Sequence, residues 1–137
     1  MNISLDKQQY LLEIIPCLCQ VTPNTKFIKG AIGITKNEIL MYSDMEPNRN
    51  NGDVGFYFPF ATLALSNVIT LIKSDIKKNT ELKKYIRLDI FMNEMNDCKI
   101  IYFLKSDKAK LMRFLRITKK AKIKLVNNVI NYDLGSC

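Results

Sequence analysis

Residues 99–120, KIIYFLKSDKAKLMRFLRITKK, contain the change of hydrophobic period on which the fold depends. The first six residues are mostly apolar, which predicts a strand. From Ser106, a residue type favoured at helix N-caps, the period becomes helical. The positions that form the resulting apolar stripe are Leu111, Phe114, Leu115 and Thr118. The stretch therefore predicts a strand followed by an amphipathic helix that starts near Asp107 and packs this stripe inward.

Six shorter segments before residue 99 carry the alternation or the composition typical of strands. They are residues 17–22, 27–35, 39–43, 56–60, 66–73 and 85–92. In the last of these segments, we expect Arg87 and Asp89 on the water-facing side. Pro59 cannot donate a backbone hydrogen bond, so its strand should be an edge strand or end there. Together with residues 99–104, the pattern predicts seven short strands before the helix.

The two ends of the chain flank these strands. Residues 4–15 begin with Ser4 and place leucines and isoleucines among polar residues, which predicts a short helix that Pro16 would end. Residues 125–132 form either a short strand or an extended tail. At 137 residues the chain suits one domain. Its expected parts are an N-terminal helix, a barrel with its capping helix, and a tail, at residues 1–15, 16–124 and 125–137.

The order of the elements narrows the fold class. A short all-β chain must protect its sheet edges by closing the sheet or nearly closing it, and a helix after the last strand can plug one open end. The predicted class is mainly β: a seven-stranded antiparallel barrel or bent sandwich, capped by one C-terminal helix and preceded by a short helix.

Three stretches of the chain carry a family resemblance. They are the hairpin KGAIGITKNEILMYS at residues 29–43, residues 58–59 followed by LSNVITLIK at 65–73, and the closing strand and helix at 99–103 and 106–115. Together they resemble the pleckstrin-homology (PH) superfold, and more narrowly its GRAM and bacterial PH-like branches. The resemblance implies a non-enzymatic adaptor that binds lipids, peptides or other proteins.

The phosphoinositide-binding members of that superfold bracket the loop of the first hairpin with several Lys and Arg residues. At that place this chain has Lys26, Lys29 and Lys36, with Asn37 and Glu38 at the turn and no arginine. The chain therefore departs from the pattern that the resemblance associates with inositol phosphates.

Missing residue types exclude most catalytic chemistry. The chain has no histidine, which excludes Ser-His-Asp and Cys-His nucleophile arrangements and HExxH metalloprotease helices. The four cysteines form neither a CxxC pair nor a zinc-knuckle spacing. We expect Cys17, Cys19 and Cys98 to be small core residues, and Cys137 to be exposed. The sequence thus predicts a protein that is not an enzyme and has no catalytic residue, cofactor or metal ion.

Positive charge is concentrated in the second half of the chain. Residues 1–68 contain five Lys or Arg and six Asp or Glu, whereas residues 69–137 contain sixteen and seven. The candidate anion-binding residues are Lys105, Lys108, Lys110, Arg113, Arg116, Lys119, Lys120, Lys122 and Lys124. Such a cluster is typical of proteins that bind an anionic membrane surface or nucleic acid, although a solvated helix face that keeps the protein soluble explains it slightly better. Only Phe114 lies among these cations as an aromatic, which favours a membrane surface over nucleic acid.

A second candidate surface is the segment 44–55 with the aromatic run that follows it. Proline, glycines and asparagines predict a mobile loop, and loops and aromatic residues often form interfaces. The candidate interface residues are Asp44, Glu46, Arg49, Asp53, Phe56 and Tyr57. The alternative is that the aromatics belong to the core and the loop is merely tolerated. On this surface another protein is the simplest partner, and the oligomeric state stays open.

The location of the protein is inferred from what its sequence lacks. The longest apolar runs fall far below the roughly 18 residues of a membrane span, and no basic leader opens the chain. We therefore expect a cytoplasmic protein. The abundance of Lys, Ile and Asn (17, 17 and 13 residues) is typical of an AT-rich bacterial or phage genome.

Overall fold

The computed structural model describes residues 11–20, 27–45, 56–78, 81–93 and 98–131. The strands are β1 (Glu13–Gln20), β2 (Phe27–Ile34), β3 (Glu38–Met45), β4 (Phe56–Ala64), β5 (Val68–Ile76), β6 (Tyr85–Met92), β7 (Cys98–Leu104) and β8 (Lys124–Ile130). One α-helix, α2 (Lys108–Lys120), follows β7 after the short 3₁₀ turn η3 (Lys105–Asp107). The predicted mainly-β class with one C-terminal helix is confirmed.

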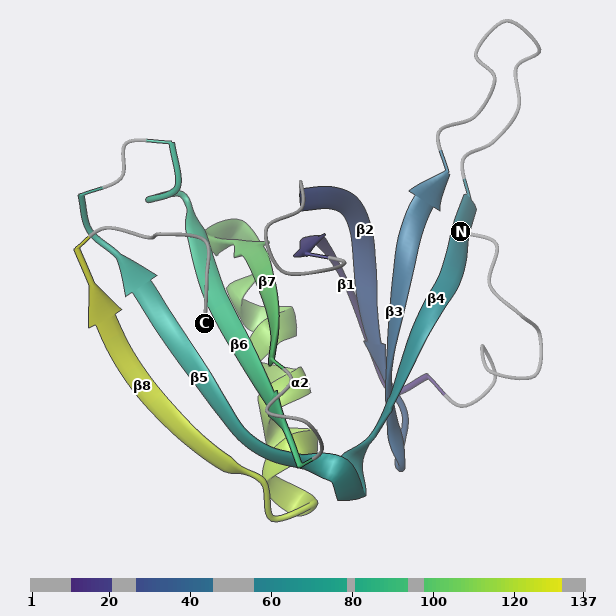
Figure 1. The fold of residues 1–137 in the computed structure, drawn as a ribbon. Helices are drawn as coiled ribbons and strands as arrows, with labels where there is room; N and C mark the ends of the chain where they lie inside the picture. The colour runs from purple at the N-terminus through teal and green to yellow at the C-terminus, as the bar shows by residue number, and fades with distance from the viewer. Residues whose placement is uncertain (1–10, 21–26, 46–55, 79–80, 94–97, 132–137) are drawn as a thin grey trace, which may run out of the picture.

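The described strands form one sheet in the order β4-β3-β2-β1-β7-β6-β5-β8. Every neighbouring pair is antiparallel except β5 and β8, which run parallel. Figure 1 shows the sheet in two halves, connected from β4 to β5 by the 3₁₀ turn η2 (Leu65–Asn67), with α2 behind β6 and β7. The sheet thus has eight described strands rather than the expected seven. Its edges are β4 and β8, so Pro59 lies on an edge strand as predicted.

The main core lies between the sheet and α2. Ile101 and Phe103 of β7 are buried there against the stripe of α2. All four predicted positions of that stripe are buried: Leu111, Phe114, Leu115 and Thr118. The period change therefore placed the helix correctly. Ser106 lies in η3, and Asp107 is the N-cap residue of α2.

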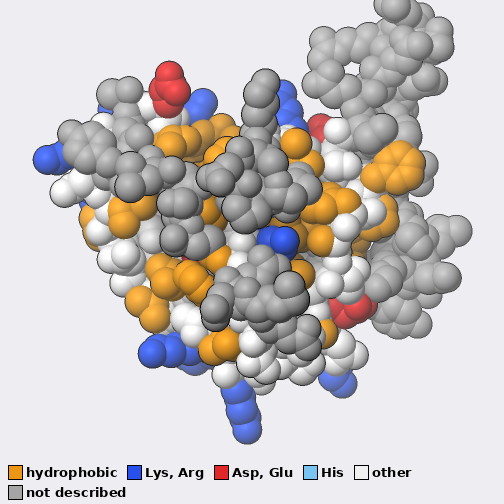
Figure 2. Space-filling model, in the orientation of Figure 1, with side chains coloured by type: hydrophobic (Ala, Val, Ile, Leu, Met, Phe, Trp, Pro, Cys, Tyr) orange, Lys and Arg blue, Asp and Glu red, His pale blue; other side chains and the backbone are white. Residues whose placement is uncertain are grey.

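Two smaller apolar clusters lie on the opposite face of the sheet. Because side chains alternate along a strand, Ile100 and Tyr102 point away from the core that contains Ile101. The Tyr102 ring packs edge-on against Phe27, with ring centroids 4.8 Å apart. Figure 2 shows hydrophobic side chains gathered over the described part of the molecule on the side away from α2. Both faces of the sheet therefore bury apolar side chains.

Double-sided burial corrects the expectation for Arg87 and Asp89. We expected both on the water-facing side of their strand, but both are buried and paired with each other. They lie on the face that carries Tyr102, since Arg87 pairs with Tyr102 across β6 and β7. A polar residue alternating with apolar ones marks the solvent face only where that face is uncovered.

The N-terminal helix expected at 4–15 is wrong for its last three residues. Glu13–Ile15 belong to β1, and residues 4–10 lie outside the described part of the chain. Pro16 does not end an element but sits within β1, opposite Ala31 of β2. The strand tolerates it because β1 pairs with β7 only at Leu18 and Cys19, so β1 has a free edge beside Pro16.

The expected tail at 125–137 is also corrected. Residues 124–130 form β8, which extends the sheet beside β5, and residues 132–137 lie outside the described part. Of the two alternatives for 125–132, the strand is confirmed. A parallel partner across a helix leaves no local turn signal, which explains why the pairing could not be predicted.

Candidate binding surface

The nine predicted basic residues lie on and around α2. Eight of them are exposed and Lys110 is half-buried. Helical spacing groups Lys108, Arg116 and Lys119 on the solvent side of α2, while Lys122 and Lys124 follow its C-terminus. The charge cluster predicted from the sequence is therefore a surface of the fold.

Arg113 differs from the other cations because it is paired. Its Nε donates a hydrogen bond to Oε2 of Glu13 on β1 over 2.6 Å. The Arg113 side chain is 52% exposed and the Glu13 side chain 13% exposed. This contact ties the helix to the sheet and removes Arg113 from the set available to a partner.

A groove opens between α2 and β8, beside the basic surface. Its volume is about 460 Å³, and its lining residues are Met112, Leu115, Arg116, Thr118, Lys119, Ile123 and Leu125. Most of this lining is apolar, and Arg116 and Lys119 form a cationic rim. Sequence reasoning missed the groove because it requires β8 to lie beside β5. The apolar residues of the segment, Ile123, Leu125, Val126, Val129 and Ile130, do not alternate, so the sequence carried no clear signal for it.

The turn between α2 and β8 sets the position of this rim. The Lys122 N–H donates to the Lys119 carbonyl over 2.9 Å, and the Ile123 N–H donates to the Thr118 carbonyl over 3.2 Å. These two bonds form a Schellman motif, which requires the left-handed backbone conformation at its C′ residue. Lys122 takes that conformation with φ of 63°. The motif turns the chain so that Ile123 is buried and β8 returns along the sheet.

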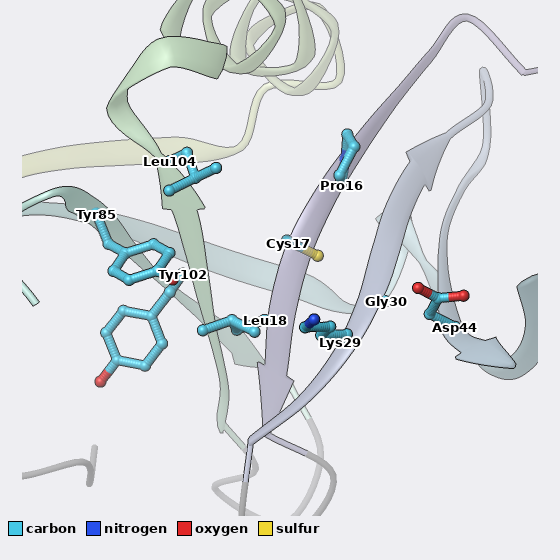
Figure 3. Close-up of a pocket in the computed structure, with 9 residues that line it drawn as sticks. All are labelled: Pro16, Cys17, Leu18, Lys29, Gly30, Asp44, Tyr85, Tyr102 and Leu104. Carbon is cyan, nitrogen blue, oxygen red and sulfur yellow. The ribbon is translucent and has the colours of Figure 1, made fainter. Parts of the chain in front are cut away.

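A second hollow lies on the face of the sheet away from α2, with a volume of about 220 Å³. Figure 3 shows Tyr85, Tyr102 and Leu18 on one side of it, and Lys29 and Asp44 on the other side of β1. Asp44 therefore belongs to β3 and to this hollow, and not to the predicted loop. None of the labelled residues pairs a nucleophile with a general base in the manner of a catalytic site.

The structure describes little of the remaining predicted interface residues. Glu46, Arg49 and Asp53 lie outside the described residues, as does the predicted mobile segment 44–55 from residue 46 on. Phe56 and Tyr57 open β4, and the structure does not describe their side chains. An interface at this place stays a prediction.

The described cysteines supply no reactive site. Cys17 and Cys19 are buried free thiols with their Sγ atoms 3.4 Å apart. Burial, followed by the hydrogen bond with Cys19, raises the pKa of the Cys17 thiol well above its usual value, which keeps it protonated and unreactive. Both fit the predicted core role, whereas Cys98 is half-buried and disulfide-bonded. Among the described residues, no cluster of three potential metal ligands exists.

Comparison with solved structures identifies the fold. No family model matches the chain, and no curated protein matches it. Among solved structures, the hSac2 domain of the human phosphoinositide phosphatase Sac2 is similar with a TM-score of 0.59 at 8% identity, covering 93% of this chain and 82% of that one. A C-terminal domain of an unknown protein from Leishmania infantum gives 0.56 at 14% identity, covering 83% and 89%.

A third similar structure is a PH domain. The Slm1-PH domain, solved in complex with phosphoserine, has a TM-score of 0.50 at 15% identity, covering 78% of this chain and 91% of that one. Identities this low speak for the fold alone. Within the described residues, no helix is both long enough and apolar enough to span a membrane. The chain has a pleckstrin-homology-like fold.

Proposed function

We propose that this chain is a non-catalytic binding module whose partner is another protein. The observation that carries the proposal is the apolar groove between α2 and β8 with Arg116 and Lys119 at its rim. An exposed apolar hollow with a few charged groups is typical of a recognition site. The PH-like fold supports the same function, because proteins of this superfold serve as adaptors.

Two finer assignments belong to the same proposal. We place the chain in the GRAM or bacterial PH-like branch, on the hairpin at residues 29–43 that the sequence shares with that pattern. We also keep the cytoplasmic location expected from the sequence, where the free thiols of Cys17 and Cys19 stay reduced, although the disulfide of Cys98 is uncommon in that compartment.

A second candidate function is electrostatic binding to an anionic membrane surface or, less favoured, to nucleic acid. It is supported by the exposed cations of α2 and of the turn after it, which form no described ion pair apart from Arg113. Lys and Arg near an anionic surface each contribute about 1 kcal/mol. This candidate uses the charge of the surface but has no role for the groove.

One set of proteins separates the two candidates. The variant Lys119→Glu/Lys120→Glu/Lys122→Glu reverses three exposed cations, and Lys36→Glu/Lys77→Glu/Lys83→Glu is its matched control elsewhere on the surface. Each full chain is tested for sedimentation with phosphatidylserine vesicles, for nucleic-acid binding, and for proteins that co-purify from native cells and re-form a complex when purified.

The expected result is a reconstituted protein complex with the wild type and the control variant. Vesicle or nucleic-acid binding at about 0.15 M salt, where the Debye length is about 8 Å, that only the α2 variant loses would instead establish the second candidate. Absence of a reconstituted complex, with or without such binding, overturns the proposal of a protein partner.

A further inference from the structure

We infer that the groove between α2 and β8 binds an acidic amphipathic segment, in which carboxylates flank apolar side chains of the partner protein. This inference rests on the proposed function and names the chemistry of the partner. Four features of the groove carry it: its apolar lining, its cationic rim, its concave shape and the backbone of Lys122.

The apolar lining is partly uncovered. Met112 is 39% exposed and Leu125 is 38% exposed, although both are large hydrophobic residues. Leu125 pairs with Leu71 of the core, so it points to the same side of the sheet as α2. Val129, four residues further along β8, lies on this side as well and is also exposed. An apolar segment laid along the groove would remove these side chains from water.

The rim selects negative charge. Arg116 and Lys119 line the groove, no Asp or Glu is among its described lining residues, and Lys122 and Lys124 are exposed nearby. The helix already binds one carboxylate in the structure, through the Arg113–Glu13 contact. Arg116 lies one helical turn further on and offers the same guanidinium fork to a carboxylate of a partner.

The shape of the groove favours a peptide segment over a bilayer. Leu115 and Ile123 line the groove but are buried, at 4% and 7% exposure, so apolar contact with its floor requires a group that enters the hollow. The flat headgroup layer of a membrane reaches the surrounding cations without filling that hollow. A volume of about 460 Å³ instead suits several side chains of a peptide.

Lys122 supplies the fourth feature. It holds a left-handed conformation that glycine adopts without strain, and a side chain there destabilises the fold. Backbone strain of this kind concentrates at functional sites. Lys122 does not line the groove but is exposed in the turn next to Ile123, which does, so a lysine here adds positive charge near the rim at a position where glycine would be more stable.

The test uses three short labelled peptides of the same length. The first combines Leu and Phe with Glu and Asp, the second replaces every acidic residue with its amide, and the third replaces every apolar residue with Ser. Fluorescence anisotropy with the full chain should show binding of the first peptide. Each of the other two should bind at least about tenfold more weakly, because each loses one half of the recognition.

Protein variants locate the binding site. Arg116→Glu/Lys119→Glu and, separately, Leu125→Ser should each weaken binding of the first peptide, whereas the matched reversal Lys36→Glu/Lys83→Glu should not. All these positions are exposed, and a thermal melt of each variant confirms folding. Binding that survives both groove variants overturns the inference.

Two further outcomes separate this inference from the function on which it rests. Equal binding of the first and third peptides means that charge alone is recognised, which overturns the apolar half of the inference. Failure of all three peptides, while a partner protein still forms a complex with the chain, overturns the inference and leaves the proposed function standing. If no peptide binds and no partner protein forms a complex with the chain, both the inference and the proposed function are overturned.

Discussion

Arg87 and Asp89 form a two-bond ion pair within β6, on the side of the sheet away from α2. The Arg87 Nε lies 2.6 Å from Asp89 Oδ1, and its Nη2 lies 2.8 Å from Oδ2. Their side chains are 7% and 9% exposed. Residues two apart on a strand point to the same face, so β6 alone brings these charges together. Each charge is therefore compensated where little water can reach it.

Because of this ion pair, a single and a double substitution should lower the free energy of unfolding by different amounts. Asp89→Ala leaves the Arg87 guanidinium buried without this carboxylate, so we expect a loss of about 3–5 kcal/mol in the free energy of unfolding. The double variant Arg87→Met/Asp89→Leu removes both charges and should lose clearly less. Urea unfolding measures both. As a control, Arg113→Met breaks an ion pair whose arginine is half-exposed, and it should cost clearly less than Asp89→Ala, about 1 kcal/mol. Equal losses for the single and double variants would contradict this account.

The same pair shows why prediction from the sequence succeeded in part. The strands were predictable from their alternation of apolar residues, and the helix from the change to a helical period at Ser106. Both are local signals that do not depend on the rest of the fold. The burial of Arg87 was not predictable, because alternation along a strand does not show whether apolar side chains also cover the polar face of the sheet. The helix predicted at 4–15 was wrong at its end for a related reason: its apolar spacing suited a helix, but Glu13–Ile15 pair with β2.

The candidate binding surface was also predictable only in part. Charge is countable in a sequence, so the basic residues from Lys105 to Lys124 were found. The groove beside them depends on Leu125 of β8 lying beside Leu71 of β5, which are far apart in the chain. The pairing of Arg113 with Glu13 has the same non-local origin, and it could not be predicted from either segment.

Phe114 belongs to the buried stripe of α2 that packs into the main core. It is completely buried, so Phe114→Ala should lower the free energy of unfolding by about 3–5 kcal/mol through lost burial and the cavity left behind. Met112 on the exposed side of the same helix provides the control, and Met112→Ala should change stability by about 0.5 kcal/mol or less. Thermal melts of the two variants decide the matter: similar melting temperatures would mean that the stripe is not part of the core.

Lys122 should be a site where glycine stabilises the protein. Its φ of 63° strains a residue with a Cβ, so Lys122→Gly should raise the free energy of unfolding by roughly 0.5–1 kcal/mol. The control is Lys119→Gly, because Lys119 lies within α2, where glycine costs about 1 kcal/mol. Opposite signs for two substitutions three residues apart are the expected result of urea unfolding. A destabilising Lys122→Gly would refute the Schellman geometry.

Tyr42 should limit stability at alkaline pH. It is buried, and its hydroxyl has no hydrogen-bond partner among the described residues, so Tyr42→Phe should raise stability at neutral pH by about 1 kcal/mol. Burial, with a smaller effect of Glu38, raises the pKa of Tyr42 above its ordinary value of 10.0. The folded state therefore favours the protonated phenol.

This preference makes stability depend on pH. The stability that the protonated phenol of Tyr42 contributes is fully present below the pKa of the unfolded chain and is lost as the pH rises through the higher pKa of the folded state. The Cys17 thiol, with its raised pKa, adds a similar loss that begins near its ordinary value of 9.0. Unfolding free energies measured from neutral pH to above 10 should thus fall less steeply for Tyr42→Phe than for the wild type, and least steeply when Cys17→Ala is added. Parallel pH profiles for the three proteins would show that neither group titrates differently on folding.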